Sequence, residues 1–378
     1  MKPNEAVIAV TMGCNSRCRT CDMWKQERGR EMKAGDYALL PPSLTHINLS
    51  GGEPYLRDDL PEIYRVLRRK FPKARIVIST NGLMPERILD MTKQMPGLAV
   101  RVSIDGLGER NDEVRGVPGS YAKSMRTLAL LEDLGVKDLG ISSTASRGNC
   151  DQLGQLLEVA WERNMEFTCS VAHSSPIYFG EQNGLVPSED ECLPVLDGIM
   201  CRQLSSRRPK EWFRAYMTSG MMDYVMSKPR RFRCTAIRDF FYLDAAGVVY
   251  PCNVRDDPMG NLLEGSYEEL VRSAPDVVQR VKDCSIECWM SCTVAPTLRR
   301  RPWIAFPWVL SHKARSVGGA QGGGQARARV VKGSGKVRVE AAKDGGKMQP
   351  AAAKRGGSVQ VDAGPCENGK KSAGAGCK

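Results

Sequence analysis

Three cysteines near the start of the chain are spaced closely enough to hold one metal cluster. Cys14, Cys18 and Cys21 lie in the sequence GCNSRCRTC, with the spacing C-x3-C-x2-C. A [4Fe–4S] cluster bound by three thiolates keeps one iron open, and an open iron can chelate a small molecule through an amine and a carboxylate. A structural zinc ion needs four ligands, and no fourth ligand lies nearby. The spacing therefore predicts a [4Fe–4S] cluster with an open iron.

Polar motifs that can contact a ligand follow three later stretches of β-rich sequence. The first, SGGEP, contains Gly51, Gly52 and Glu53; its two glycines allow close approach of a ligand, and Glu53 can accept a hydrogen bond from an ammonium group. The second motif contains Asn81, and the third contains Ser103 and Asp105. For each motif the alternative is an ordinary turn at the end of a strand, because Asn-Gly and Asp-Gly are common turn sequences.

These residues need a scaffold that brings strand ends together. Short apolar runs that end in Gly, Asn or Ser predict six strands, at Ala6–Val10, His46–Ser50, Arg75–Thr80, Ala99–Ile104, Asp138–Ser143 and Glu166–Val171. Amphipathic stretches between them predict helices at Leu60–Phe71, Pro85–Met95, Tyr121–Leu134 and Gln152–Arg163. Crossovers of this length favour a parallel sheet, so the expected fold is α/β, with ligands at the carboxyl ends of the strands.

A second group of cysteines lies toward the C-terminal end. It comprises Cys234, Cys252, Cys284, Cys288 and Cys292. The sequence predicts a two-stranded hairpin around Gly247–Cys252 and a helix at Ser266–Ser273. The last three cysteines would share one face if their segment were helical, so which of them joins the first two is open. A second [4Fe–4S] cluster and a zinc ribbon are the two interpretations of this group.

The first cysteine loop and the strand-end motifs resemble those of the radical SAM superfamily. The resemblance implies a partial (β/α)6, TIM-like barrel with the cluster on the loop after the first strand. It also implies that SGGEP is the GGE motif, which receives the amino group of S-adenosylmethionine (SAM). Similar enzymes have the fourth-strand Ser and Asp near the SAM ribose and the substrate. The cofactor-binding residues implied are Gly51, Gly52, Glu53, Asn81, Ser103 and Asp105.

The cysteine-rich region resembles the SPASM and shorter twitch domains that follow many radical SAM barrels. With five candidate ligands rather than seven cysteines, it implies one auxiliary [4Fe–4S] cluster. The implied activity is reductive cleavage of SAM to a 5′-deoxyadenosyl radical, which abstracts hydrogen from a substrate, with flavodoxin or ferredoxin as electron donor. A small molecule, a sugar, a lipid-linked compound and a peptide are all candidate substrates, and no general acid or base is identified. The alternative function is an iron–sulfur or zinc protein that binds nucleic acid or a membrane through a basic tail.

The net charge of +12 comes from one end of the chain. Residues 1–298 hold 38 basic and 39 acidic residues, whereas the remainder holds 17 basic and 4 acidic residues. A nucleic-acid partner for the body is therefore not indicated. Neither a secretory signal nor an apolar run long enough to span a membrane is visible, which predicts a cytoplasmic protein. The expected parts are a barrel at 1–205, connector helices at 206–233, a SPASM/twitch domain at 234–298, a segment at 299–313 and a disordered tail at 314–378.

The segment 299–313, RRRPWIAFPWVLSHK, combines arginines with tryptophans. Trp303 and Trp308 beside cations suit a peripheral contact with the inner face of a membrane, where indole rings lie at the level of the lipid headgroups. The alternative is that the segment packs on the barrel or caps the cysteine-rich domain. The membrane interpretation would favour a lipid-linked substrate.

Overall fold

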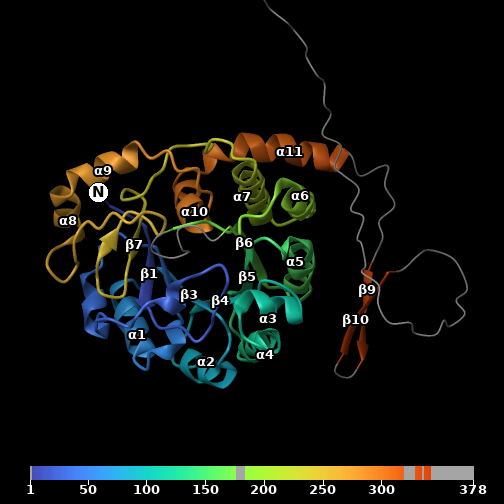
Figure 1. Cartoon of the computed structure of the whole chain (residues 1–378), viewed down its shortest axis with the longest axis horizontal. Helices are drawn as coiled ribbons and strands as arrows, with labels where there is room; N and C mark the ends of the chain where they lie inside the picture. The colour runs from blue at the N-terminus through green and yellow to red at the C-terminus, as the bar shows by residue number, and fades with distance from the viewer. Residues whose placement is uncertain (1, 176–183, 319–327, 334–335, 342–378) are drawn as a thin grey trace, which may run out of the picture.

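The computed structural model describes residues 2–175, 184–318, 328–333 and 336–341. Its centre is an eight-stranded sheet in the order β6-β5-β4-β3-β2-β1-β7-β8 (Figure 1). The first six strands are parallel, each paired with the next along the chain. They are β1 Glu5–Thr11, β2 His46–Gly51, β3 Arg75–Thr80, β4 Ala99–Ser103, β5 Leu139–Ala145 and β6 Glu166–Val171. The predicted α/β fold with a six-stranded parallel sheet is confirmed.

Helices between the strands cover the outer face of the sheet. They are α1 Leu60–Lys70, α2 Pro85–Thr92, α3 Glu109–Arg115, α4 Ser120–Asp133 and α5 Leu153–Glu162. In α1 the buried residues Leu60, Ile63, Tyr64 and Leu67 recur at helical spacing and face the core. The main apolar core therefore lies between the sheet and this layer of helices.

The cysteine-rich region continues the same sheet. Strand β7 (Phe240–Leu243) pairs in parallel with β1, and β8 (Val249–Tyr250) pairs antiparallel with β7. The helices around it are α6 Glu189–Ser205, α7 Pro209–Val225, α8 Tyr267–Ser273, α9 Pro275–Lys282 and α10 Ser291–Arg300. The predicted hairpin and the helix after Ser266 are both present. Strand β7, which follows the predicted boundary at residue 234, pairs with the first strand of the barrel and so extends its sheet.

Helix α10 lies between β6, an edge strand of the sheet, and β1, the first strand of the barrel. At its start, the Ser291 hydroxyl lies 3.2 Å from that of Ser170 on β6. At its other end, Arg299 forms an ion pair with Glu5 on β1. Helix α10 thus connects the last strand of the barrel with the first, across the side where the sheet is open.

Short 3-10 helices and the C-terminal elements complete the described chain. The 3-10 helices are η1 Met23–Lys25, η2 Ala34–Leu39, η3 Pro54–Leu56, η4 Cys150–Gln152 and η5 Pro302–Ile304, and they are followed by α11 Phe306–Gly318, β9 Ala328–Gly333 and β10 Lys336–Ala341. Helix α11 packs on α6 and α7. Within the stretch from residue 314 that the sequence predicts to be disordered, α11 runs to Gly318, and β9 and β10 pair as an antiparallel hairpin. Polar and apolar residues alternate in β10, which is typical of a strand; the rest of the tail lies outside the described residues.

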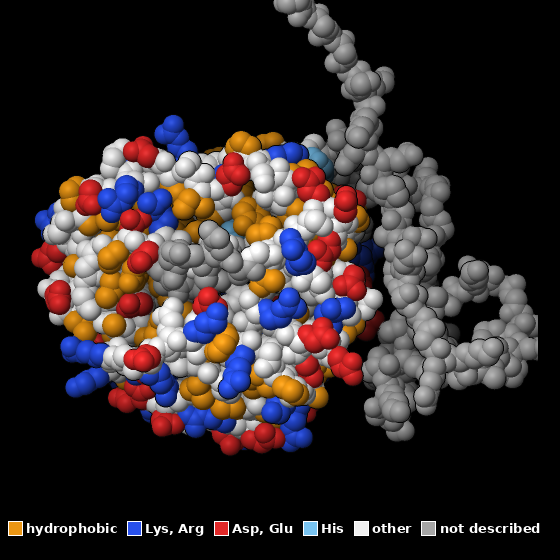
Figure 2. Space-filling view, in the orientation of Figure 1, with side chains coloured by type: hydrophobic (Ala, Val, Ile, Leu, Met, Phe, Trp, Pro, Cys, Tyr) orange, Lys and Arg blue, Asp and Glu red, His pale blue; other side chains and the backbone are white. Residues whose placement is uncertain are grey.

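Charged side chains of both signs are interspersed on the face drawn in Figure 2. This distribution agrees with the nearly balanced charge of residues 1–298. Among the residues that the structure describes, no helix has the length and apolar character needed to cross a membrane.

Candidate functional site

The three-cysteine loop leaves the carboxyl end of β1 and is held by polar contacts to its own sulfurs. The amide of Ser16 donates to Cys14 Sγ at 3.4 Å, and the Ser16 hydroxyl lies 3.2 Å from Cys18 Sγ. Burial raises the pKa of Cys14 to about 11 and that of Cys21 to about 12. These thiols therefore carry protons in the metal-free protein and release them when they bind iron.

Glycines of the GGE motif let this loop lie against β2. A side-chain carbon at Gly52 would lie 2.0 Å from the carbonyl oxygen of Gly13, and one at Gly51 would lie 2.3 Å from that of Thr11. Gly51 also has a φ of 118°, which other residues rarely adopt. The sequence suggested that these glycines make room for a ligand. In the structure they make room for the backbone of the cysteine loop itself.

Glu53 is a fully buried carboxylate at the ends of β2 and β3. It accepts hydrogen bonds from the Thr80 hydroxyl at 2.8 Å, from the Asn81 amide at 2.7 Å and from the Tyr55 amide at 3.2 Å. Burial nevertheless raises its pKa to about 7, because these neutral donors do not compensate fully for the loss of water. A buried carboxylate of this kind fits a cationic ligand such as an ammonium group.

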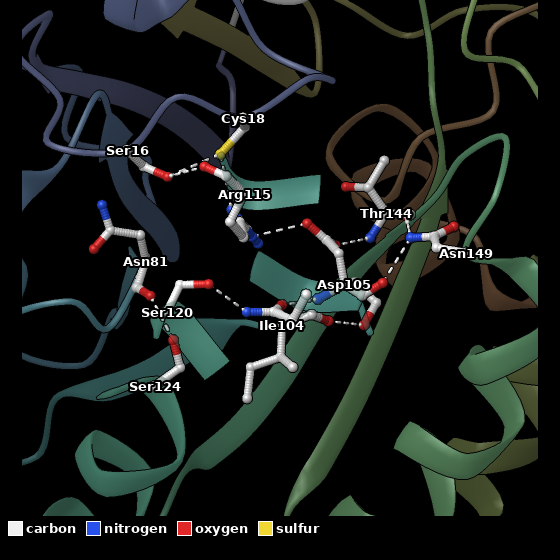
Figure 3. A network of polar contacts seen from close by, with 12 residues as sticks. Ser16, Cys18, Asn81, Ile104, Asp105, Arg115, Ser120, Ser124, Thr144 and Asn149 are labelled. Atoms are coloured by element: carbon white, nitrogen blue, oxygen red, sulfur yellow. Dashed lines mark hydrogen bonds and ion pairs between the residues drawn. The ribbon is translucent and has the colours of Figure 1, made fainter. Parts of the chain in front are cut away.

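A buried ion pair links the cysteine loop to the end of β4 (Figure 3). Arg115 Nη1 donates to Cys18 Sγ at 3.5 Å, and Arg115 Nε lies 2.8 Å from Asp105 Oδ2. Burial opposes the charge on Arg115, but Asp105 and Cys18 outweigh it and raise the pKa of the guanidinium. Asp105 also accepts from the Thr144 amide at 2.7 Å. Both oxygens of Asp105 are therefore engaged with the protein, and its carboxylate positions Arg115 beside the cysteine loop.

Asn81 and Ser103 lie at the same end of the sheet. Asn81 Nδ2 donates to Asn15 Oδ1 at 2.7 Å and lies 3.9 Å from Cys14 Sγ. Ser103 is half-buried at the last position of β4, in register with Ser142 on β5. The structure thus brings the cysteine loop, the GGE motif and the two later strand-end motifs to one edge of the sheet.

Four of the five C-terminal cysteines line one cavity. They are Cys234, Cys252, Cys284 and Cys288, contributed by the segment before β7, the loop after β8 and the loop between α9 and α10. Cys292 is not among the lining residues, and its thiol donates instead to Asn253 Oδ1 at 3.5 Å. The single helical face considered for the last three cysteines is absent, because α9 ends at Lys282 and α10 begins at Ser291. Four thiols around one cavity match the ligand set of a [4Fe–4S] cluster.

Two arginines at this cavity were missed by the sequence analysis. Arg230 Nη1 donates to Cys288 Sγ at 3.4 Å, and Arg255 Nη1 lies 3.8 Å from Cys284 Sγ. Guanidinium groups beside thiols stabilise the thiolate form that binds metal. The sequence offered a signal for Arg230 alone, in the basic run RRFRC that leads into Cys234. Among the described residues, no three His, Cys, Asp or Glu side chains are arranged as a site for a single metal ion.

Comparison with known proteins agrees with this geometry. The family model described as "Radical SAM superfamily" matches residues 8–152. The Fe-coproporphyrin III synthase of Methanosarcina barkeri is 31% identical over 168 residues, which cover 42% of this chain and 41% of that protein. The sporulation killing factor maturation protein SkfB of Bacillus subtilis is 23% identical over 280 residues, which cover 71% of this chain and 64% of that protein. The chain thus spans less than half of the first relative and less than two thirds of the second.

Solved structures share the fold. Streptococcus suis SuiB bound to S-adenosylmethionine superposes with a TM-score of 0.51 at 17% identity, covering 69% of this chain and 64% of that chain. Members of the matched superfamily are enzymes that use a [4Fe–4S] cluster and SAM, and the cysteine loop of this chain is at the corresponding end of a parallel sheet. A radical SAM domain thus occupies residues 8–152 of the chain, and a cysteine-rich region follows it.

Proposed function

We propose that this chain reductively cleaves SAM and uses the resulting 5′-deoxyadenosyl radical to take hydrogen from a substrate. The observation that carries the proposal is the position of Glu53 beside a loop of three cysteines; it is a buried carboxylate that has no cationic partner in hydrogen-bonding range among the residues that the structure describes. When bound, the cluster supplies the electron that breaks a carbon–sulfur bond of SAM. Flavodoxin or ferredoxin is the electron donor that we propose.

In this proposal the residues of the chain bind and orient the cofactors. Cys14, Cys18 and Cys21 hold the first cluster, and Glu53 accepts from the amino group of SAM. Asn81 and Ser103 line the approach to the SAM ribose, and Arg115 holds Cys18 in place. We expect anaerobically reconstituted protein to hold about two [4Fe–4S] clusters and to form 5′-deoxyadenosine when given a strong reductant. Protein that binds iron but leaves SAM intact would contradict the proposal.

The pKa of Glu53 predicts that SAM binding weakens in acid. Below about pH 7, Glu53 takes up a proton in the free protein, and a neutral carboxyl attracts an ammonium group much less. Gln at this position does not titrate. Between pH 5 and 7 we therefore expect affinity for SAM to fall by about one additional factor of ten per pH unit in the native protein relative to Glu53→Gln. Anaerobic equilibrium binding measures how the affinity for SAM changes with pH in both proteins. The same pH dependence in the two proteins would exclude Glu53 as the partner of the amino group.

The second part of the proposal is an auxiliary [4Fe–4S] cluster held by the four cysteines that line one cavity. Arg230 and Arg255 support this assignment, because each directs a guanidinium at a different sulfur of the set. Two positive charges compensate the negative charge that four thiolates bring to a cluster. A zinc ion bound by the same thiols is the alternative. It would favour the function of a protein that binds nucleic acid or a membrane over that of an enzyme.

The substrate class is a separate proposal. The names of the relatives include a porphyrin synthase and the maturation protein of a killing factor, so similarity alone favours neither a small molecule nor a peptide. An exposed apolar face at the C-terminal end favours a substrate at a membrane. Trp303, Phe306 and Leu310 are 64%, 52% and 55% exposed, while Ala305 and Val309 on the opposite side are buried. The inner side of this segment therefore packs on the protein, and its exposed apolar side supports the proposal of a contact with lipid.

The arginines expected to meet lipid have other partners in the structure. Arg299 pairs with Glu5, while Arg300 and Arg301 both pair with Asp239. The remaining positive charge lies after Lys313, where the sequence has 13 basic and 4 acidic residues. Attraction to anionic lipid would therefore come from this later stretch, and insertion from the apolar face.

Vesicle binding tests this membrane contact. We expect the full chain to sediment with vesicles of phosphatidylcholine and phosphatidylglycerol at low salt. The triple variant Trp303→Ser, Phe306→Ser, Leu310→Ser should bind about tenfold more weakly, because it loses the apolar area that enters the lipid. The matched control is Leu39→Ser with Leu134→Ser, which removes exposed leucines elsewhere on the surface. Equal binding of the triple variant and the native chain would refute the contact.

A further inference from the structure

The inner face of the barrel sheet is polar and only half-buried. In β2 the outward-facing Ile47 and Leu49 are fully covered by helices, whereas His46, Asn48 and Ser50 on the other face are partly exposed. This inner face borders a cavity of about 660 Å³. Small polar side chains from four strands line it: Asn48, Ser79, Ser142, Thr168 and Ser170. Complete TIM barrels fill this space with branched apolar side chains, so the lumen here is built differently.

Cations outnumber carboxylates at the amino-terminal end of this cavity. Arg75 Nε lies 2.7 Å from Asp138 Oδ2, and Arg101 Nη2 lies 2.6 Å from Asp138 Oδ1. One carboxylate is thus shared by two arginines, and the three groups together carry one net positive charge. Both arginines together with burial set the pKa of Asp138: burial raises it, but the arginines outweigh burial and lower it, so Asp138 stays ionised.

The same arrangement occurs on the opposite side of the rim. Lys210 and Arg214, both from α7, form ion pairs with Glu166 at the start of β6. Arg214 also pairs with Glu211 at 2.6 Å, which lies behind it and outside the cavity lining. The exposed Lys137 adds another cation. The lining residues in total include six Lys or Arg and three Asp or Glu, an excess of three positive charges. The excess is still two when Glu211 is counted with them.

The other end of the cavity points toward the candidate SAM site. Ser142, which lines the cavity, is in register with Ser103 on the neighbouring strand. A molecule in the lumen can therefore have one end at the cationic rim and the other beside the strand end that carries Ser103. The volume lies within the range of about 300–1,000 Å³ that is usual for small-molecule sites.

We propose that this lumen binds a phosphorylated sugar, with its phosphate at the rim near Arg75, Lys137 and Lys210. Its hydroxyl groups then meet the serine and threonine hydroxyls of the inner sheet face, which can both donate and accept hydrogen bonds. The excess positive charge attracts a dianion, and apolar side chains that also line the cavity, such as Val77, Met217 and Met221, can pack against the carbon skeleton of the sugar. The inference that this ligand is the substrate rests on the proposed function. The inference that the lumen binds it is independent of that function.

Binding is measured by calorimetry on the full, anaerobically reconstituted chain without SAM or reductant. The probes are glucose 6-phosphate, inorganic phosphate and glucose. We expect glucose 6-phosphate to bind most tightly, since it alone uses both the rim and the hydroxyl-lined lumen. The double variant Lys137→Gln, Lys210→Gln should weaken binding of both phosphate-containing probes about tenfold. Ser142→Ala should reduce only the advantage of glucose 6-phosphate over phosphate.

The matched control is Lys93→Gln with Lys123→Gln, which removes one exposed charge just after the outer helix α2 and one from the outer helix α4. An equal loss of affinity in this control would mean that only net charge attracts the probes, and the proposal would fail. It would also fail if glucose 6-phosphate bound no more tightly than phosphate. The calorimetry contains no SAM, so its result is independent of the separate assay for SAM cleavage. Binding of glucose 6-phosphate by a protein that leaves SAM intact in that assay would support this site and contradict the proposed function, and SAM cleavage by a protein that does not bind glucose 6-phosphate would do the reverse.

Discussion

Replacement of Cys18 by Ala is expected to abolish the formation of 5′-deoxyadenosine from SAM and to leave the auxiliary cluster in place. The Cys18 thiol is buried and contacts both the Ser16 hydroxyl and Arg115. Without it, two thiols remain in the loop, which is one fewer than the cluster with an open iron requires. Chromatography of the products after anaerobic incubation with SAM and dithionite measures the loss, and electron paramagnetic resonance measures the cluster that remains.

Cys192→Ala is the matched control for this variant. Cys192 is a fully buried thiol on α6, outside both groups of proposed ligands. Its loss leaves a small cavity and lowers stability, but the control should still cleave SAM. If Cys18→Ala also formed 5′-deoxyadenosine at the native rate, the first cluster would be assigned to the wrong residues.

The strands of the barrel were predictable because their signals are local. For β3 and β6 the predicted bounds, Arg75–Thr80 and Glu166–Val171, are those of the structure. Their apolar residues form short runs that end in turn residues, and neither property depends on distant parts of the chain. The pairing of β7 with β1 was not predicted, because it joins segments far apart in sequence and no local pattern specifies such a partner.

The candidate site was predictable where one short motif carries it. The spacing of Cys14, Cys18 and Cys21 is contained in a single loop. The partners of Glu53 could not be found in this way, since Thr80 belongs to the next strand and is brought in only by the sheet. Arg115 is similar, because no local pattern in the sequence separates a buried arginine from a surface one. The structure pairs it with Asp105 in the interior.

The C-terminal cysteines show that sequence periodicity alone does not predict which thiols lie together. Cys284, Cys288 and Cys292 recur every four residues, so a helical pattern treats them alike. The chain is not helical between Lys282 and Ser291, and the first two thiols reach a cavity that the third does not line. A break in the helix, which repetition in the sequence does not reveal, therefore separates Cys292 from the others.

Replacement of Cys252 by Ala is expected to remove the auxiliary cluster and to stop substrate turnover while sparing SAM cleavage. Cys252 is buried, and it lines the same cavity as Cys234, Cys284 and Cys288. After the replacement, three thiols and the two guanidinium groups of Arg230 and Arg255 remain, which is one thiol fewer than the four proposed as ligands of the auxiliary cluster. We expect iron to fall from about eight to about four atoms per chain, with the SAM-cleaving cluster retained.

Replacement of any one of the four cavity cysteines should remove the auxiliary iron. Cys292→Ala is the matched control, because it removes a nearby cysteine that does not line the cavity. Cys292 lies one helical turn after Cys288 in sequence, yet its thiol donates to Asn253. We therefore expect Cys288→Ala to lose the auxiliary iron and Cys292→Ala to keep it, as measured by metal analysis and electron paramagnetic resonance of anaerobically isolated protein. Zinc in place of iron at this cavity would contradict an auxiliary cluster. Loss of iron from Cys292→Ala to the same extent as from Cys288→Ala would contradict the four-cysteine assignment, because a cysteine outside the cavity would then be needed to hold the iron.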